Sequence, residues 1–379
     1  MSSTTSNRHS ASPPLLSSSV PTDTLRRDAS HSPARELANA PLTSPSVLAR
    51  GRLATLTGVQ VLGTGSYAPA VVVRNEDLAP LGYDADWIIQ RTGIRERRRA
   101  ASQEATSDLA YEAAVACLRQ ANVRPQDVDL IVLATMSGDS PTPSTACRLQ
   151  NRLGCVAPAF DVSAACAGFM YALVTGMQFV KTGSAQRALV VGADVMSRVV
   201  DPQDKKTYPL FGDGAGAVLL GPGSAEQGLL AYMLGADGSG AELLHVPAGG
   251  SREPMTADGL STGRQFMQMD GRAVFKWAVR LLVDAIREVI AHAHLTTHDI
   301  DLVVLHQANR RILDAAASDL GIEADRVIMN LDRYGNTSAG SIPLVLDELA
   351  QEGRLQRGMR VLTCGFGAGL AWGAGVYQW

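Results

Sequence analysis

The chain repeats itself, and this repeat restricts the possible folds more than any other feature. The segment Asp127–Leu133 (DVDLIVL) returns 172 residues later as Asp299–Leu305 (DIDLVVL), and Arg187–Gly192 is likewise similar to Arg360–Gly365. In both copies helical patterns alternate with short apolar runs. Such alternation indicates βαβ units whose parallel strands are buried on both faces. Because only two copies are present, we expect two similar α/β halves packed as one duplicated body rather than a solenoid.

Composition divides the chain into an extension and two halves. Residues 1–50 contain 12 Ser, 6 Pro and 5 Thr, so they offer too little apolar surface to offset the entropy lost on ordering. We expect a dispensable, disordered extension over residues 1–52. An organellar transit peptide is the alternative for this Ser- and Arg-rich segment, although three acidic residues argue against it. The two halves are predicted to span 53–225 and 226–379.

Charge, cysteines and hydropathy exclude several classes of protein. The net charge is −3 with both signs interspersed, so nucleic acid is not an expected partner. No run of 18 apolar residues is present, so no membrane span is expected. The five cysteines (117, 147, 155, 166 and 364) form no CxxC pair, which favours free thiols, a reducing compartment and a cytoplasmic location.

Cys166 is the candidate nucleophile. It follows an apolar run and stands where a helical pattern begins, among small residues. Unpaired N–H groups and the dipole at a helix N-terminus stabilise a thiolate. The alternative is a small buried hydrophobic residue, which is the commoner use of a free cysteine.

Two further polar residues lie where side chains of the second half can converge on Cys166. His306 follows the strand that ends at Leu305, and Asn336 lies in the segment Tyr334–Ser341 before another helix. A histidine near a cysteine either takes its proton or donates a hydrogen bond to a substrate carbonyl. An asparagine amide adds a neutral donor that suits a developing enolate. A core or capping histidine and a turn asparagine are the alternatives.

Five motifs, in order and in register, resemble those of β-ketoacyl-acyl-carrier-protein synthase III. They are Asp161–Gly168, Phe211–Ala217, His306–Asn309, Asn336–Ser341 and Gly365–Gly369. The resemblance runs from about Gly58 to the C-terminus and leaves the N-terminal extension outside.

The resemblance implies a thiolase fold, with duplicated βαβ halves in a layered αβαβα body, and a homodimer. It also implies a Cys-His-Asn triad of Cys166, His306 and Asn336. In that family the cysteine takes an acyl group from acyl-CoA and joins it, by decarboxylative Claisen condensation, to malonyl-acyl carrier protein. The acyl oxyanion would be bound by the backbone N–H groups of Cys166 and Ala368. No cofactor and no metal are implied.

The resemblance also assigns binding residues. Coenzyme A would be held by Trp87, Arg91, Arg198 and Asn309, which agrees with an aromatic residue beside an arginine-rich segment. A basic stripe, spaced by four residues on a long helix, would receive the acidic carrier protein together with two neighbouring arginines; these residues are Arg272, Lys276, Arg280, Arg310 and Arg311. A solvated helix face is the alternative. Ser318 and Asp319 replace lysines of some relatives, which weakens the docking prediction.

Thr142 is expected to affect which acyl groups fit the pocket. It takes the place of a phenylalanine that, in the family, often closes the acyl pocket of the partner subunit, so longer or branched primers are expected to fit.

Other hypotheses remain at this point. An acyltransferase or condensing enzyme of secondary metabolism (polyketide-type) would use the same cysteine, and a degenerate scaffold subunit would use none. Cys364 stands close to the position at which thiolases have a second catalytic cysteine, but it is displaced from that position by one residue. His292, His294 and His298 are not spaced as metal ligands, and Gly212–Gly216 lacks the Lys-Ser/Thr of a phosphate loop.

Overall fold

Two five-stranded sheets form the frame of residues 51–379, the part of the chain that the computed structural model describes. The first sheet has the order β2-β8-β7-β5-β6 and the second the order β1-β9-β14-β13-β12. The strands of the first are β2 (Val59–Tyr67), β5 (Leu130–Ala134), β6 (Ala159–Val162), β7 (Ala188–Asp194) and β8 (Gly214–Pro222). Those of the second are β1 (Ala54–Thr57), β9 (Gly228–Ala236), β12 (Leu302–Leu305), β13 (Arg360–Gly367) and β14 (Ala371–Gln378). Two small antiparallel strand pairs, β3 (Val71–Arg74) with β4 (Glu96–Arg99) and β10 (Leu244–His245) with β11 (Gln268–Met269), lie outside the two large sheets.

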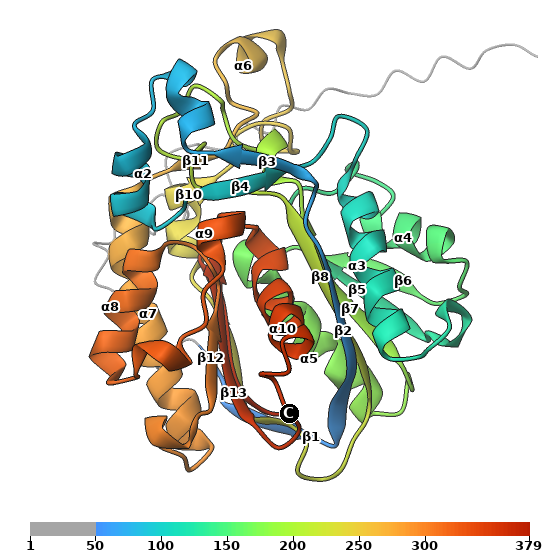
Figure 1. Cartoon of the computed structure of the whole chain (residues 1–379). Helices are drawn as coiled ribbons and strands as arrows, with labels where there is room; N and C mark the ends of the chain where they lie inside the picture. The colour runs from blue at the N-terminus through green and yellow to red at the C-terminus, as the bar shows by residue number, and fades with distance from the viewer. Residues whose placement is uncertain (1–50) are drawn as a thin grey trace, which may run out of the picture. The chain divides into compact units, whose positions relative to one another are not determined.

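Helices complete a body of five layers, shown in Figure 1. Between the sheets lie α5 (Gly168–Lys181) and α10 (Ser341–Gln351); outside the first sheet lie α3 (Thr106–Gln120) and α4 (Thr145–Leu153), and outside the second α7 (Gly271–His292) and α8 (Arg310–Leu320). The shorter helices are α2 (Ala85–Thr92), α6 (Ala257–Ser261) and α9 (Leu331–Tyr334). Each interface between layers is an apolar cluster; the central one joins Phe169 and Met170 of α5 with Ile342 and Val345 of α10.

The predicted duplication is confirmed by the strand pairing. β5 pairs in parallel with β7, as β12 does with β13, and each pair has an antiparallel neighbour, β8 or β14. The expected boundary at 225/226 falls in the turn between β8 and β9. Strand β1 is an exception, because it pairs with β9 and so belongs to the sheet of the second half.

The start of the ordered region also differs slightly from the prediction. Gly51 already forms a β-bridge with Gly235, two residues before the expected start of the first half. The prediction of disorder for residues 1–50 lies outside the described residues.

Local signals explain where the long elements begin and end. Helix α7 starts three residues before its apolar pattern at Val274, because the Asp270 carboxylate accepts from Arg272 N (3.2 Å) and Ala273 N (3.1 Å). Gly58, with φ of 86°, separates β1 from β2. No helix within residues 51–379 is long and apolar enough to cross a membrane.

The two halves meet at the carboxyl ends of their parallel strands. Two 3-10 turns lie there, η4 (Ala165–Ala167) before α5 and η9 (Ser338–Gly340) before α10. η4 packs against β13 of the other half, and η9 against β7. The chemistry predicted for Cys166, His306 and Asn336 is therefore expected at this junction.

Candidate active site

Cys166 lies in η4, directly before α5, and is only 6% exposed. The preceding residue, Ala165, has φ of 45°, a left-handed conformation that an alanine rarely adopts. Across from this turn runs the end of β13: a Cβ added to Gly367 would lie 2.8 Å from Cys166 N. The sulfur therefore sits in a strained turn that the second half presses against.

The surroundings of Cys166 oppose ionisation of its thiol. Burial raises the pKa of Cys166 to about 12, while the Ser338 hydroxyl acts in the opposite direction. The position at a helix N-terminus favours a thiolate, as the sequence suggests, but the desolvation of the sulfur becomes evident only in the structure. In the absence of substrate the group is thus a thiol at neutral pH.

His306 follows β12 and is 1% exposed. Its backbone N–H donates to Cys364 O (2.9 Å), which extends the pairing of β12 with β13 by one residue. Its Nδ1 lies 2.7 Å from Ser341 Oγ, and its ring stands edge-on to Phe366 with 5.2 Å between centroids. Burial lowers the pKa of His306 to about 3, so the imidazole is neutral at physiological pH.

Asn336 is held by its backbone and by its side chain. Its N–H donates to Leu210 O (2.9 Å), its carbonyl accepts from Gly212 N (3.0 Å), and Phe211 and Asn336 form a parallel bridge. Ser338 N–H donates to Asn336 Oδ1 (2.8 Å). A backbone N–H only donates, so the amide oxygen must face Ser338 and the amide NH₂ faces away from it.

The three side chains line one cavity of about 100 Å³. Its walls are mainly apolar and include Met136, Phe211, Leu244, Met267, Val274 and Phe366. Ala368 also lines it, and because this residue has no positive φ, its backbone N–H needs no glycine. The cavity is thus suited to hold an apolar acyl group beside a thiol and several neutral N–H donors.

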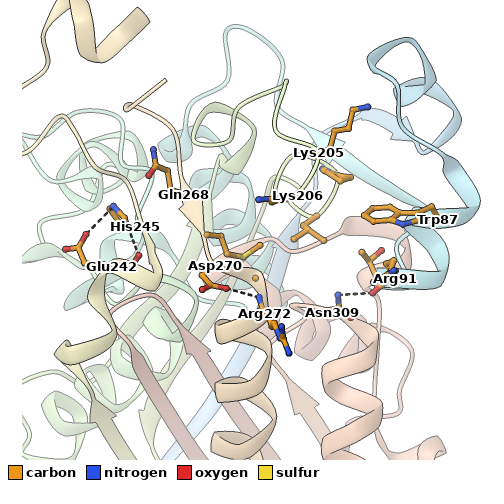
Figure 2. Close-up of a pocket in the computed structure, with 15 residues that line it drawn as sticks. Trp87, Arg91, Lys205, Lys206, Glu242, His245, Gln268, Asp270, Arg272 and Asn309 are labelled. Atoms are coloured by element: carbon orange, nitrogen blue, oxygen red, sulfur yellow. Dashed lines mark hydrogen bonds and ion pairs between the residues drawn. The ribbon is translucent and has the colours of Figure 1, made fainter. Parts of the chain in front are cut away.

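A larger, polar groove adjoins this cavity, and both are lined by Leu210, Met269, Gly271 and Asn309. The groove has a volume of about 760 Å³. Figure 2 shows Trp87, Arg91 and Asn309 on one side of it, with Arg272, Lys205 and Lys206 near by. The Arg91 guanidinium lies 5.6 Å from the centre of the Trp87 ring. The groove therefore offers an aromatic face and several cations to an extended anionic ligand.

The chain matches two family models and many known proteins over the same region. Residues 160–238 match 3-oxoacyl-[acyl-carrier-protein (ACP)] synthase III, and residues 290–379 match its C-terminal part. A β-ketoacyl-[acyl-carrier-protein] synthase III of Rhodopirellula baltica is 56% identical over 345 residues, which cover 86% of this chain and all of that protein. The chain belongs to the 3-oxoacyl-[acyl-carrier-protein] synthase III family.

Solved structures of synthase III agree with this assignment and with the thiolase fold. The enzyme of Aquifex aeolicus VF5 is 42% identical with a TM-score of 0.78, and the match covers 85% of this chain and all of that one. A priming β-ketosynthase from the R1128 polyketide pathway is 36% identical with a TM-score of 0.78, over 86% and 97% of the two chains. As a synthase III, the chain is an acyltransferase, the condensing enzyme that initiates fatty acid synthesis. The higher identity to synthase III proteins does not favour the alternative in secondary metabolism.

Not all residues assigned by resemblance to synthase III lie together. Trp87, Arg91 and Asn309 line the groove, whereas Arg198 does not; its guanidinium donates to Ala101 O (3.0 Å) and Ser102 O (3.2 Å). Asn309 is also engaged within the chain, because its Nδ2 donates to Arg91 O (3.1 Å) and its Oδ1 accepts from Arg311 N (2.9 Å). Asn309 therefore joins α2 to α8 in addition to lining the groove.

The expected carrier-protein stripe is only partly continuous. Lys276 and Arg280 line a second, shallow groove of about 390 Å³ between α7 and α8, whereas Arg272 lines the first. Arg280 lies 3.8 Å from Asp284, and Arg310 3.4 Å from Asp314. Arg311 stacks at 5.6 Å over Phe275. Neighbouring carboxylates thus reduce the positive charge of the stripe.

Several other residues that the sequence singled out lie away from the cavity. Thr142 follows β5 on an outer loop and does not line the Cys166 cavity of its own chain, so its role toward a partner subunit stays a prediction. Cys364 is buried in β13 and does not line the cavity either. Within residues 51–379 no group of three His, Cys, Asp or Glu side chains suits a metal ion. The sequence also suggested a tight turn over Gly212–Gly216, which is wrong for most of the segment: Gly212 packs against Tyr334, but Gly214–Gly216 are the first residues of strand β8.

Several site residues were not foreseen from the sequence. Ser338 and Ser341 lie within the Asn336–Ser341 motif, but only Asn336 of that motif was predicted to have a role. Lys205 and Lys206 form a basic pair in the long segment between β7 and β8 and line the groove. The sequence signal that could have pointed to Ser341 was its position in the same motif as Asn336. Phe366 lies within the Gly365–Gly369 motif, which was used only for Ala368, and nothing in the sequence marks Met136; both line the cavity.

Proposed function

We propose that Cys166 is the nucleophile of this synthase III and that His306 and Asn336 stabilise the enolate of the condensation step. The observation that carries this assignment is their convergence, from different halves of the chain, on one buried cavity. The acyl donor is acyl-CoA and the acceptor is malonyl-acyl carrier protein.

In the first half-reaction the Cys166 sulfur attacks the carbonyl of the acyl-CoA thioester. A C–S bond to Cys166 forms, the bond to the coenzyme A sulfur breaks, and coenzyme A leaves with the thiol proton. The tetrahedral oxyanion is bound by the N–H groups of Cys166 and Ala368. The close contact between Gly367 and the Cys166 turn supports this pairing of donors.

In the second half-reaction malonyl-acyl carrier protein loses CO₂. The electrons of the broken C–C bond pass to the thioester enolate, whose oxygen is held by His306 and Asn336. The enolate carbon then attacks the acyl group on Cys166, a new C–C bond forms, and the Cys166 thiolate leaves and takes a proton from the solvent. These steps balance without a cofactor, so acyl-CoA and malonyl-acyl carrier protein serve only as substrates.

Coenzyme A would occupy the groove of Figure 2, with its adenine on Trp87 and its phosphates near Arg91, Arg272 and the two lysines. The carrier protein would dock on α7 and α8 through Lys276 and the neighbouring arginines, in a salt-sensitive contact. Arg198 would contact coenzyme A only if its guanidinium left the carbonyls that it now binds.

We further propose a cytoplasmic homodimer. Strand β6 ends the first sheet and has no second neighbour among residues 51–379, and the nearby Val156 is 98% exposed. An open strand edge beside exposed apolar surface favours pairing with a second copy. Thr142, on the loop between β5 and α4, would then face the partner's acyl pocket and admit longer or branched primers.

A mass experiment tests this proposal. The protein is incubated with acetyl-CoA or longer acyl-CoAs, its intact mass is recorded, and malonyl-acyl carrier protein is added while CO₂ and ketoacyl product are measured. The wild type and the control Cys364→Ala should gain the acyl mass and release it as product. Acylation of Cys166→Ala would refute the nucleophile. Acylation without condensation would refute malonyl-acyl carrier protein as the acceptor and favour the secondary-metabolism alternative, and no acylation would indicate a scaffold.

A further inference from the structure

Ser341, the first residue of α10, lies behind His306 rather than in the cavity. Both residues are almost completely buried, at 2% and 1% exposure, and 2.7 Å separates Ser341 Oγ from His306 Nδ1. Because Ser341 does not line the cavity, it acts on a substrate only through His306.

The hydrogen-bond partners of Ser341 determine which of the two groups donates. A serine hydroxyl has one proton to donate and two lone pairs. Gln307 N–H donates to Ser341 Oγ at 3.4 Å, which is a long bond. Within residues 51–379 the Ser341 hydroxyl has one acceptor, His306 Nδ1. If His306 donated instead, a buried O–H group would be left without an acceptor, which is unfavourable because the desolvation of that group is not compensated.

A neutral imidazole carries a single N–H group. If Nδ1 accepts from Ser341, the proton of His306 must be on Nε2, on the opposite side of the ring. The pKa of His306, lowered by burial, keeps the ring in this neutral form at physiological pH. Asn336 is oriented in the same sense, because its oxygen is occupied by Ser338 N–H and its NH₂ group is left to donate.

We propose that Ser341 is a positioning residue that fixes His306 as the Nε2–H tautomer, so that His306 donates to the substrate carbonyl and does not take the proton of Cys166. The inference rests on the proposed function, and it decides between the two roles that the sequence left open for His306. It also predicts that the two half-reactions depend on Ser341 to different extents.

A direct test uses the wild-type protein labelled with ¹⁵N-histidine. The His306 resonances are assigned by comparison with His306→Gln. We expect an unprotonated Nδ1 and a protonated Nε2 at pH 7.5 in the substrate-free protein. A protonated Nδ1 would overturn the inference, whatever the enzyme's activity.

A second test separates the half-reactions in Ser341→Ala. Acylation by acyl-CoA should stay within about threefold of wild type. Condensation with malonyl-acyl carrier protein should slow about 10- to 100-fold, which is less than the loss expected when an oxyanion donor is removed altogether. Ser341→Thr, which keeps the hydroxyl, should restore most of the condensation rate. Thr296→Ala is the matched control, because it removes a hydroxyl bond to Asp299 (2.6 Å) at the opposite end of β12.

The outcomes are distinguishable from failure of the proposed function. Equal losses in both half-reactions, or unchanged condensation, would overturn the role of Ser341. If wild type itself fails to form acyl-Cys166, the proposed function fails, while the tautomer measured by NMR still decides the state of His306.

Discussion

Burial and the start of a helix act in opposite directions on the thiol of Cys166. The pKa of about 12 means that the burial of the sulfur outweighs the backbone N–H groups in the absence of substrate. In the proposed first half-reaction, the thiol proton therefore passes to the coenzyme A sulfur as the C–S bond to that sulfur breaks.

Alkylation measures this property of Cys166 directly. Because only the thiolate reacts, the rate of iodoacetamide labelling should rise about tenfold per pH unit from pH 7 to 10. Labelling of Cys166 is followed by peptide mass, with exposed Cys147 as the internal reference. A plateau in Cys166 labelling near pH 8 would contradict the raised pKa.

His306 couples acidity to stability. Its pKa is about 3 when folded and 6.5 when unfolded, so acidification favours the unfolded chain, which binds the extra proton. The contribution is fully present above pH 6.5 and is lost as pH falls toward 3, at up to about 1.4 kcal/mol per pH unit.

Urea unfolding at pH 7.5 and 5 tests this prediction. Wild type should lose about 2 kcal/mol more than His306→Gln between these values. His298→Gln, at an exposed histidine, should behave as wild type. The same pH dependence in wild type and His306→Gln would show that the buried imidazole does not cause it.

At the residue scale the sequence predicts which polar side chains meet in the cavity better than it predicts the residues that position them. Cys166, His306 and Asn336 are recognisable because their chemistry is rare at the ends of strands and starts of helices. Ser341 is not, since a serine before a helix most often caps it, and only the structure places its oxygen on His306. For Arg198 the sequence shows the charge but not where the side chain points, and in the structure the guanidinium binds a backbone carbonyl rather than lining the groove.

At the scale of elements, β7 and η9 form a close junction of the two halves. A Cβ added to Gly192 of β7 would lie 2.1 Å from Ala339 O. Gly192→Ala must therefore displace η9, which follows Asn336 and precedes Ser341. We expect a loss of about 1–3 kcal/mol in unfolding free energy, and slower condensation.

Gly238→Ala is the matched control for this substitution. Nothing lies within 4 Å of a Cβ added at Gly238, and its φ is not positive. Both variants are compared by urea unfolding and by the condensation assay. Equal stability of Gly192→Ala and wild type would mean that β7 and η9 are not in fixed contact.

Most elements could be predicted from periodicity, but their correspondence between halves could not. The sequence suggests that Ser163–Cys166 matches Ser338–Ser341. In the structure η4 and η9 correspond instead, so Ala165 matches Ser338 and Cys166 matches Ala339. Ala165 and Ser338 both have positive φ, at 45° and 51°, and neither is the glycine that would signal such a turn.

At the scale of the whole molecule, the open edge of β6 predicts association. A lysine at Phe160, which packs near Phe179, should oppose pairing of two β6 edges and shift a dimer to monomer in analytical ultracentrifugation. Val71→Lys, at an exposed position of β3, is the control. A wild-type monomer at micromolar concentration would contradict the proposed homodimer.

Docking of the carrier protein is predicted to depend on α7. Lys276→Glu should raise the KM for malonyl-acyl carrier protein about two- to fivefold, the size expected for exposed ion pairs, and should leave acylation by acyl-CoA unchanged. The effect should shrink as salt is added, because salt screens exposed charges. An effect of equal size on acylation would place Lys276 in the coenzyme A site instead.

The place of β1 has a consequence for synthesis of the chain. Strand β1 (Ala54–Thr57) leaves the ribosome early, yet it pairs with β9 (Gly228–Ala236). The other neighbour of β9 in the sheet is β14, which ends at Gln378. The first sheet can form once β8 is made, whereas the second must wait for almost the entire chain. We therefore expect folding to begin in the cysteine-bearing half, and the junction that holds the active site to form last, after translation ends.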